Sequence, residues 1–127
     1  MYNINQIKKL QERFSQKREI YQQADYTEAQ TRIDFINPFF TALGWDVDNK
    51  AGLTESYRQV VYEDRVKIDK APYKHPDYSF RVGGVRKFFV EAKKPSISLS
   101  SDSEAAYQIR RYGWNAKLSL SILTNFA

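Results

Sequence analysis

The sequence predicts an α/β fold in which a mixed central β-sheet is flanked by helices. Apolar residues recur at helical spacing in two segments near the start of the chain. A pair of glycines then separates two alternating segments, a pattern typical of a β-hairpin. A helical segment and an apolar strand follow. The predicted order is therefore α-α-β-β-β-α-β, in a chain of 127 residues that is long enough for one domain.

The first predicted helix runs from residue 4 to about residue 23. Its apolar face comprises Ile7, Leu10, Phe14 and Tyr21. Its other faces carry the basic residues Lys8, Lys9, Arg13, Lys17 and Arg18. Two interpretations stay open for these charges: a solvated helix surface, or a basic helix close to a nucleic-acid backbone.

The second predicted helix begins near Thr27, because Thr27 and Gln30 fit a capping box that satisfies two backbone N–H groups. Pro38 should kink or restart this helix. Gly44 and Trp45 mark its end. The predicted buried stripe of the helix comprises Ile33, Ile36, Phe40 and Leu43.

A polar loop at 46–56 leads into three predicted strands, over residues 57–68, 77–82 and 87–93. A serine-rich loop at 96–103 follows.

The last predicted helix opens at a second capping-box match, Ser101 with Glu104, and ends near Tyr112, before Gly113. The final predicted strand covers residues 118–124.

The apolar pattern selects the register of the predicted hairpin. A two-residue loop would place apolar and charged residues on the same face. A three-residue loop at 83–85 pairs Phe80 with Phe88 and Tyr78 with Val90, which gives a clean apolar face. Because a slip of one residue reverses every side chain, the three-residue loop is predicted. The opposite face then pairs Arg81 with Lys87, Ser79 with Phe89, and Asp77 with Glu91.

This register predicts a metal site. It places the Cβ atoms of Asp77 and Glu91 about 5 Å apart on one face, with Lys93 two residues beyond on the same face. Like charges so close need compensation, which a bound cation provides. Asp77 and Glu91 are the predicted ligands, and the carbonyl of Ala92 is a further candidate. Lys93 would either orient a water and offset developing negative charge, or act as the base.

Four residues of the last predicted helix are supporting candidates. Gln108 and Tyr112 share one face at a spacing of four residues, where the glutamine could meet a phosphate or a water and the tyrosine could pack below it. Arg110 and Arg111 fit either phosphate contacts or solvated charge.

Five residues elsewhere receive alternative interpretations. Glu28 lies in a first helical turn, where the helix dipole favours acids, or it reaches the site as a further metal ligand. His75 is expected in a loop rather than as a ligand. Glu63 and Asp64 could approach the site from the preceding strand, but are not assigned to it. Lys94 fits a phosphate contact or plain surface.

Composition narrows the class of function. The net charge is +5 and the pI is about 9.4, which favours a polyanionic partner such as nucleic acid. The chain has no cysteine, which excludes disulfides, thiolate zinc sites and cysteine nucleophiles and fits a cytoplasmic setting. With a single histidine, metal ligands must be mainly oxygen, which favours Mg²⁺, with Mn²⁺ as a substitute.

No apolar run reaches transmembrane length, so no membrane partner is expected. The chain stops inside an apolar strand, which predicts an N-terminal fragment of a larger protein.

Four motifs in this order resemble a known enzyme family. Pro76-Asp77, then thirteen residues, then Glu91-Ala92-Lys93 resembles the signature of the PD-(D/E)xK nucleases. The stretch from Glu28 to Trp45 resembles the opening of nuclease domains in type I restriction motor subunits and in fused type II restriction-methylation enzymes. Gln108 and Tyr112 match the Q-x-x-x-Y extension of that branch, and the stretch 123–126 resembles its following strand.

The resemblance covers residues 27–126 and implies a restriction-endonuclease-like core with Mg²⁺-dependent cleavage of double-stranded DNA. It implies one nuclease domain over 1–127, with a basic helix at 1–25 outside the match. Glu28, Asp77, Glu91 and Lys93 would be active-site residues, supported by Gln108 and Tyr112. The larger protein would add a methyltransferase, helicase or target-recognition part.

Two other functions stay open. The same fold could serve as a catalytically idle module for DNA binding or docking, or as a nuclease acting on branched DNA. Double-strand cleavage needs two active sites or two successive nicks, so a dimer on DNA is a further hypothesis.

Overall fold

The computed structural model describes residues 2–64, 75–101, 103–118 and 120–127, with the side chains of 101 and 103 left out. The predicted strand at 57–68 therefore lies partly outside the described residues, and so does the second capping box. The helices are α1 (Ile4–Gln16), α2 (Arg18–Tyr21), α3 (Glu28–Thr31), α4 (Asn37–Ala42) and α5 (Ser103–Asn115). The strands are β1 (Val60–Tyr62), β2 (Tyr78–Val82), β3 (Val85–Ala92) and β4 (Ser121–Thr124).

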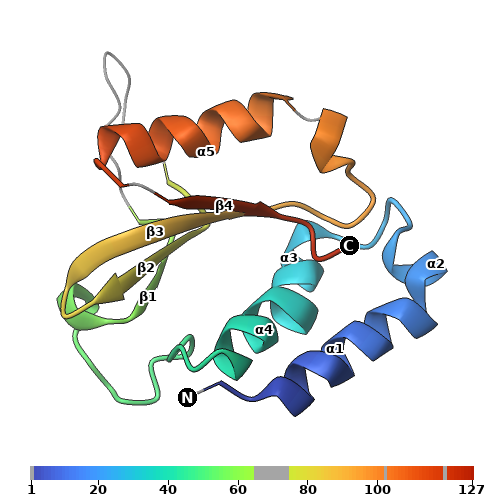
Figure 1. Cartoon of the computed structure of the whole chain (residues 1–127), viewed down its shortest axis with the longest axis horizontal. Coiled ribbons are helices and arrows are strands. Elements are labelled where there is room, and N and C mark those ends of the chain that lie inside the picture. Colours follow the sequence, from blue (N-terminus) through green and yellow to red (C-terminus); the bar gives the residue numbers. More distant parts are fainter. Residues whose placement is uncertain (1, 65–74, 102, 119) are drawn as a thin grey trace.

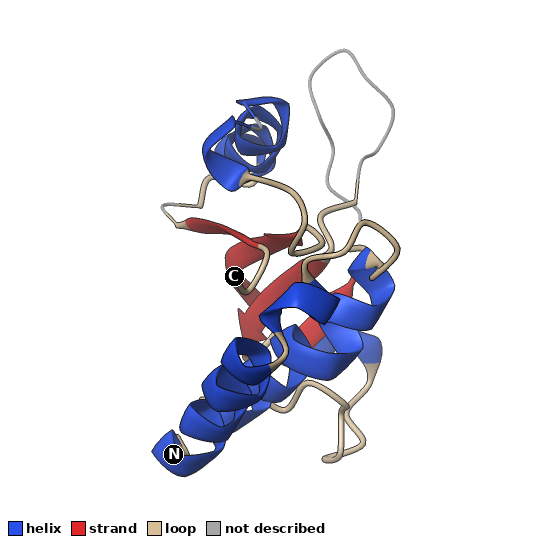
Figure 2. Ribbon diagram, turned by 90° about the vertical axis from the view of Figure 1, so that its right-hand side faces the viewer, coloured by secondary structure: helices blue, strands red, loops and turns tan. Residues whose placement is uncertain are grey.

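The strands form one mixed sheet in the order β1-β2-β3-β4. β1 is antiparallel to β2 and β2 to β3, whereas β4 runs parallel to β3. In Figure 1, α5 covers one face of the sheet, and α1, α3 and α4 lie on the other side. Figure 2 shows the same layers from the side. The predicted fold class, a mixed sheet flanked by helices, is confirmed.

The hairpin between β2 and β3 reaches the predicted pairing by a different route. Tyr78 pairs with Val90, Ser79 with Phe89, and Phe80 with Phe88, as predicted. The loop is the two-residue turn Gly83-Gly84, with φ angles of 57° and 81° that suit glycine. The predicted three-residue loop and the pair Arg81–Lys87 are wrong, because a β-bulge next to Phe80 absorbs one residue and Arg81 pairs with Arg86.

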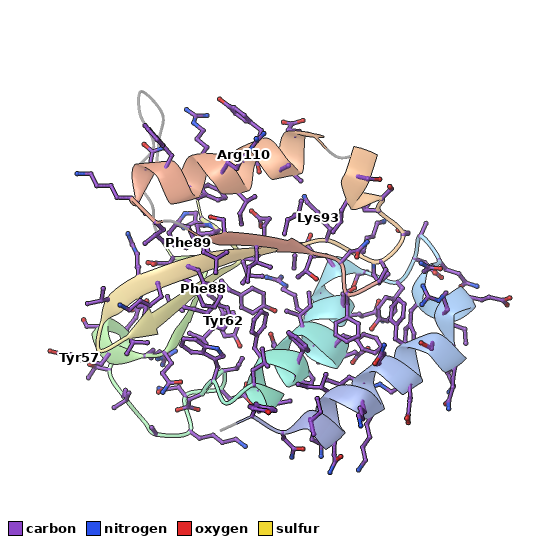
Figure 3. All side chains as sticks on the ribbon, viewed as in Figure 1. Tyr57, Tyr62, Phe88, Phe89, Lys93 and Arg110 are labelled. Atoms are coloured by element: carbon purple, nitrogen blue, oxygen red, sulfur yellow. The ribbon has the colours of Figure 1, made fainter. Side chains whose placement is uncertain are left out.

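Adjacent residues of β3 belong to two separate hydrophobic cores, one on each face of the sheet. Phe88 stacks on Phe80 at 4.6 Å between ring centroids, on the α4 side of the sheet. Phe89 lies on the other side, where Tyr112 of α5 meets it edge-on. Figure 3 labels both phenylalanines on β3. The alternation along β3 therefore fixes which residues face α5 and which face α4.

Residues 28–42 form one helical segment that includes a π-helical turn, Arg32–Ile36. Pro38 has no N–H to donate to the carbonyl of Asp34, and the guanidinium of Arg13 donates to that carbonyl instead. The π-turn also shifts the buried face. Phe35 and Ile36 are buried, whereas two members of the predicted stripe, Ile33 and Leu43, are exposed.

The basic N-terminal segment packs on this helical segment rather than forming one continuous helix. The predicted helix at 4–23 breaks at Lys17, which separates α1 from α2. Leu10 and Phe14 are buried in a cluster with Tyr26 and Phe35. The guanidinium of Arg18 lies 5.2 Å from the ring centroid of Phe14. At least part of the basic charge therefore contributes to packing inside the domain.

Two smaller predictions also need correction. α5 continues through Gly113 and ends at Asn115. A Cβ on Gly113 would approach Ser121 Oγ to 2.6 Å, so this glycine allows close packing against Ser121 and does not end the helix. The strand predicted to begin at residue 57 begins at Val60, and Tyr57 belongs to a 3₁₀ turn, Glu55–Tyr57. Within the described residues, no helix has the length and apolar character needed to span a membrane.

The capping box at the start of α3 gives a testable contribution to stability. Gln30 N–H donates to Thr27 Oγ1 at 3.1 Å, and Thr27 N–H donates to Gln30 Oε1 at 2.8 Å. We expect Thr27→Ala to lower the free energy of unfolding by about 1 kcal/mol, measured by urea denaturation. Thr54→Ala is the matched control, because Thr54 precedes a 3₁₀ turn without a side-chain cap. Equal losses in the two variants would contradict the prediction.

Candidate active site

Three carboxylates converge where the second helical segment meets the ends of β2 and β3. Glu28, Asp77 and Glu91 each offer an oxygen, and these atoms lie within 4.8 Å of one another. Glu28 comes from the first turn of α3, Asp77 directly precedes β2, and Glu91 is near the end of β3. Residues far apart in the sequence thus present an all-oxygen donor set, the kind that Mg²⁺ and Mn²⁺ prefer.

The backbone holds Asp77 in place. The pairing of Tyr78 with Val90 is the last of the ladder, so Asp77 and Glu91 are the next residues on facing strands. Ala92 N–H donates to Asp77 Oδ2 at 2.8 Å across the same strands. Lys93 N–H donates to the carbonyl of Thr124 at 2.9 Å, which ties the end of β3 to β4. The predicted juxtaposition of the two acids is therefore present, with Oδ2 of Asp77 engaged by the backbone.

Two of the three carboxylates, Glu28 and Glu91, have a raised pKa. Burial is the largest cause for Glu91, followed by a hydrogen bond and charge repulsion from Asp77, and together they raise its pKa to about 9. Burial also raises the pKa of Glu28, again with a hydrogen bond and repulsion from Asp77. When ionised, the buried carboxylates therefore repel one another, and either a bound proton or a bound cation reduces this repulsion.

Two cationic side chains border the cluster. The charge of Lys93 lowers the pKa of both Glu91 and Glu28, which opposes the effect of burial. Figure 3 labels Lys93 just beyond the end of β3. Arg32 Nη1 lies 3.7 Å from Asp77 Oδ1. Arg32 was not among the predicted site residues, although its position four residues after Glu28 on one helix face is a signal that could have found it.

Of the two α5 candidates spaced four residues apart, one is buried and the other is exposed. Tyr112 is buried against Phe89, and its pKa is raised first by burial and then by the charges of Glu91 and Asp77. Gln108, one turn earlier, is exposed.

The two arginines of α5 also differ. Arg110 projects from α5 away from the sheet in Figure 3. Arg111 is half-buried, and its carbonyl accepts a hydrogen bond from Asn115 at 2.8 Å.

Several other candidates make contacts elsewhere. Lys94 Nζ donates to the carbonyl of Ala24 at 2.9 Å, an intramolecular contact that neither of its predicted roles included. Asp64 pairs with Arg81 and Arg86, each at 2.7 Å.

His75 is exposed in a loop, as predicted, and its Nδ1 lies 2.8 Å from the carbonyl of Glu63.

One curated protein is similar to nearly the whole chain. The Type II restriction enzyme and methyltransferase RM.Eco57I of Escherichia coli is 43% identical over 127 residues, which cover 99% of this chain. The chain spans only 13% of the length of that relative. The similarity includes the N-terminal helix that the resemblance at 27–126 left out. No family model matches the chain, and no solved structure matches it.

Proposed function

We propose that the chain is the nuclease domain of a restriction-modification protein, and that it hydrolyses phosphodiester bonds of double-stranded DNA with the help of a divalent cation. The observation that carries this proposal is the convergence of Glu28, Asp77 and Glu91 beside Lys93. The similarity to RM.Eco57I supports the same function from an independent direction. The proposed type is a PD-(D/E)xK endonuclease with a restriction-endonuclease-like core.

The donor set fits a hard divalent cation. The carboxylates of Glu28, Asp77 and Glu91 would hold Mg²⁺ or Mn²⁺, with the carbonyl of Ala92 as a further oxygen. When bound, such an ion lowers the pKa of a coordinated water and neutralises charge on the phosphate. The crowding that raises the pKa of Glu91 favours this arrangement, because a divalent ion compensates like charges more fully than a proton does.

Lys93 would act on the reacting groups. Its position beside Glu91 allows the ammonium either to orient the attacking water and stabilise negative charge on the pentavalent phosphorus, or to take the proton of that water. Asp77 needs a fixed orientation, which the Ala92 N–H provides. Tyr112 would support Phe89 beneath the cluster.

Gln108 and Arg111 of α5, together with Lys94, are proposed to assist DNA binding. The full protein is proposed to carry a methyltransferase, helicase or target-recognition part, to work in the cytoplasm, and to dimerise on DNA for double-strand cleavage.

Plasmid cleavage is the direct test of the proposed function. The chain is incubated with supercoiled DNA in Mg²⁺, Mn²⁺ or EDTA, and nicked and linear products are separated on agarose. We expect nicking with either ion and none in EDTA. DNA binding that weakens with salt but gives no product with either ion would instead support the idle-module alternative.

A further inference from the structure

Arg32 lies between the carboxylate cluster and an open cavity. Its guanidinium is 3.7 Å from Asp77 Oδ1, too far for a hydrogen bond, and the side chain is 27% exposed. The other oxygen of Asp77 already accepts from the Ala92 N–H. A cation bound by Asp77 would therefore use Oδ1, the oxygen nearest to Arg32. Because this pair has no hydrogen bond to lose, Arg32 can exchange Asp77 for another anion more readily than it can stay unpaired.

The cavity beside Arg32 has a volume of about 320 Å³. Tyr62 contributes an aromatic wall, and the fully buried Tyr78 lies behind it with ring centroids 5.5 Å apart. Tyr62 is 42% exposed, and Figure 3 labels it on the side of the sheet facing α4. Glu63 also lines the cavity but is exposed, so water and salt screen its charge more than that of Arg32. An aromatic surface next to a half-buried guanidinium suits a nucleotide, with the phosphate at the arginine.

The charge balance of the loaded site points to the same ligand. A divalent cation on three ionised carboxylates leaves one negative charge, which Lys93 cancels. The charge of Arg32 is then in excess, and its former partner Asp77 is neutralised by the ion. A half-buried cation in this state needs another anion. A phosphodiester supplies a single negative charge and acceptors that match the guanidinium fork.

We propose that Arg32 exchanges Asp77 for a DNA phosphate when a divalent cation occupies the carboxylates, so that metal binding and DNA binding strengthen one another. This inference rests on the proposed nuclease function. Arg32 is a substrate-binding residue in this scheme, and the nucleotide that carries the phosphate lies along the cavity walled by Tyr62.

The test uses the whole chain with Arg32→Gln, Arg32→Lys and a control variant, Arg58→Gln, whose arginine is exposed after the 3₁₀ turn. Mn²⁺ affinity without DNA is measured by titration calorimetry. Affinity for a fluorescent duplex is measured by anisotropy, in EDTA and in Ca²⁺, over a range of salt concentrations. Thermal unfolding of every variant reports whether the fold is retained.

For Arg32→Gln we expect Mn²⁺ to bind as tightly as in the parent or up to about tenfold more tightly, because a competing cation is gone. Duplex affinity in Ca²⁺ should fall by about tenfold or more, and the salt slope by about one. In EDTA the affinity should change by less than about twofold. Arg32→Lys keeps the charge, so its salt slope should match the parent while its affinity falls by several-fold. Arg58→Gln should stay within about twofold throughout.

Three results would overturn the inference. If Arg32→Gln weakens Mn²⁺ binding as much as DNA binding, Arg32 only orders the carboxylates. If Arg32→Gln or Arg32→Lys binds the duplex in Ca²⁺ as the parent does, while the parent cleaves DNA, Arg32 does not contact the phosphate. If the parent neither binds Mn²⁺ nor cleaves DNA, the proposed function itself is wrong. This result is obtained before any variant is compared, so it is distinct from the failure of the Arg32 inference.

Discussion

Asp77→Asn is expected to reduce the rate of metal-dependent DNA nicking by about 10³-fold or more. Asp77 is the carboxylate that interacts with both Glu28 and Glu91, so its charge contributes at the centre of the proposed site. Asparagine has nearly the same shape and one neutral acceptor oxygen. The measurement is the initial rate of conversion of supercoiled plasmid in saturating Mg²⁺.

Asparagine is the better substitution because the structure assigns Asp77 a backbone contact as well. Its amide oxygen can still accept from Ala92 N–H, as Oδ2 does in the parent, whereas alanine would leave that buried donor without its partner. We expect Asp77→Asn to unfold at the same temperature as the parent or higher. Asp25→Asn, at an exposed position, is the control. If Asp77→Asn nicks DNA at the parental rate, the site assignment fails.

Glu91→Gln is expected to stabilise the metal-free domain in alkaline buffer. The pKa of Glu91 rises from 4.5 to about 9 on folding, chiefly through burial. The folded state therefore holds a proton that the unfolded state releases, and the parent loses stability as pH rises from about 4.5 to about 9. Glutamine has no proton to lose and stays neutral at every pH of the experiment. At pH 9 the variant should exceed the parent by on the order of 1–3 kcal/mol in free energy of unfolding.

The measurement is urea unfolding in EDTA at pH 6, 7.5 and 9. The advantage of Glu91→Gln should grow across this series, and adding Mg²⁺ at pH 9 should stabilise the parent more than the variant, because the ion binds the charged form. Glu12→Gln, on the exposed surface of α1, is the control. An advantage that is independent of pH would show that packing, not ionisation, distinguishes the variant.

The part of the site carried by the sheet could be predicted from the sequence, because the alternation of side chains along a strand is a local signal. Phe80, Phe88 and Val90 defined an apolar face, and that face alone brought Asp77 opposite Glu91. The bulge next to Phe80 and the two-residue turn were not predictable in this way, since a bulge and a longer loop give the same pairing. Glu28 was a candidate ligand from its position, but that position fitted a helix start equally well, and only the family resemblance placed it among the active-site residues.

Two features depended on contacts between distant segments. The π-turn before Pro38 shifted the buried face to Phe35, and the carbonyl of Asp34 found its donor in Arg13, one helix away. Arg32 lies near Asp77 because the end of α3 lies beside the start of β2. Periodicity reports which face of an element is apolar, and it carries no information on which element lies opposite.

The ring of Phe126 lies within 5.8 Å of the centroid of Phe14 and 4.9 Å of that of Phe35. An aromatic residue of the first helix, Phe14, thus packs against Phe126, which is nearly the last residue of the described chain. While a ribosome is still making the chain, that neighbour is absent, and β4 is also missing beside β3, which carries Glu91. The proposed nuclease centre would therefore be completed only after residue 126 has left the exit tunnel, and DNA cleavage by the nascent chain is not expected before that point.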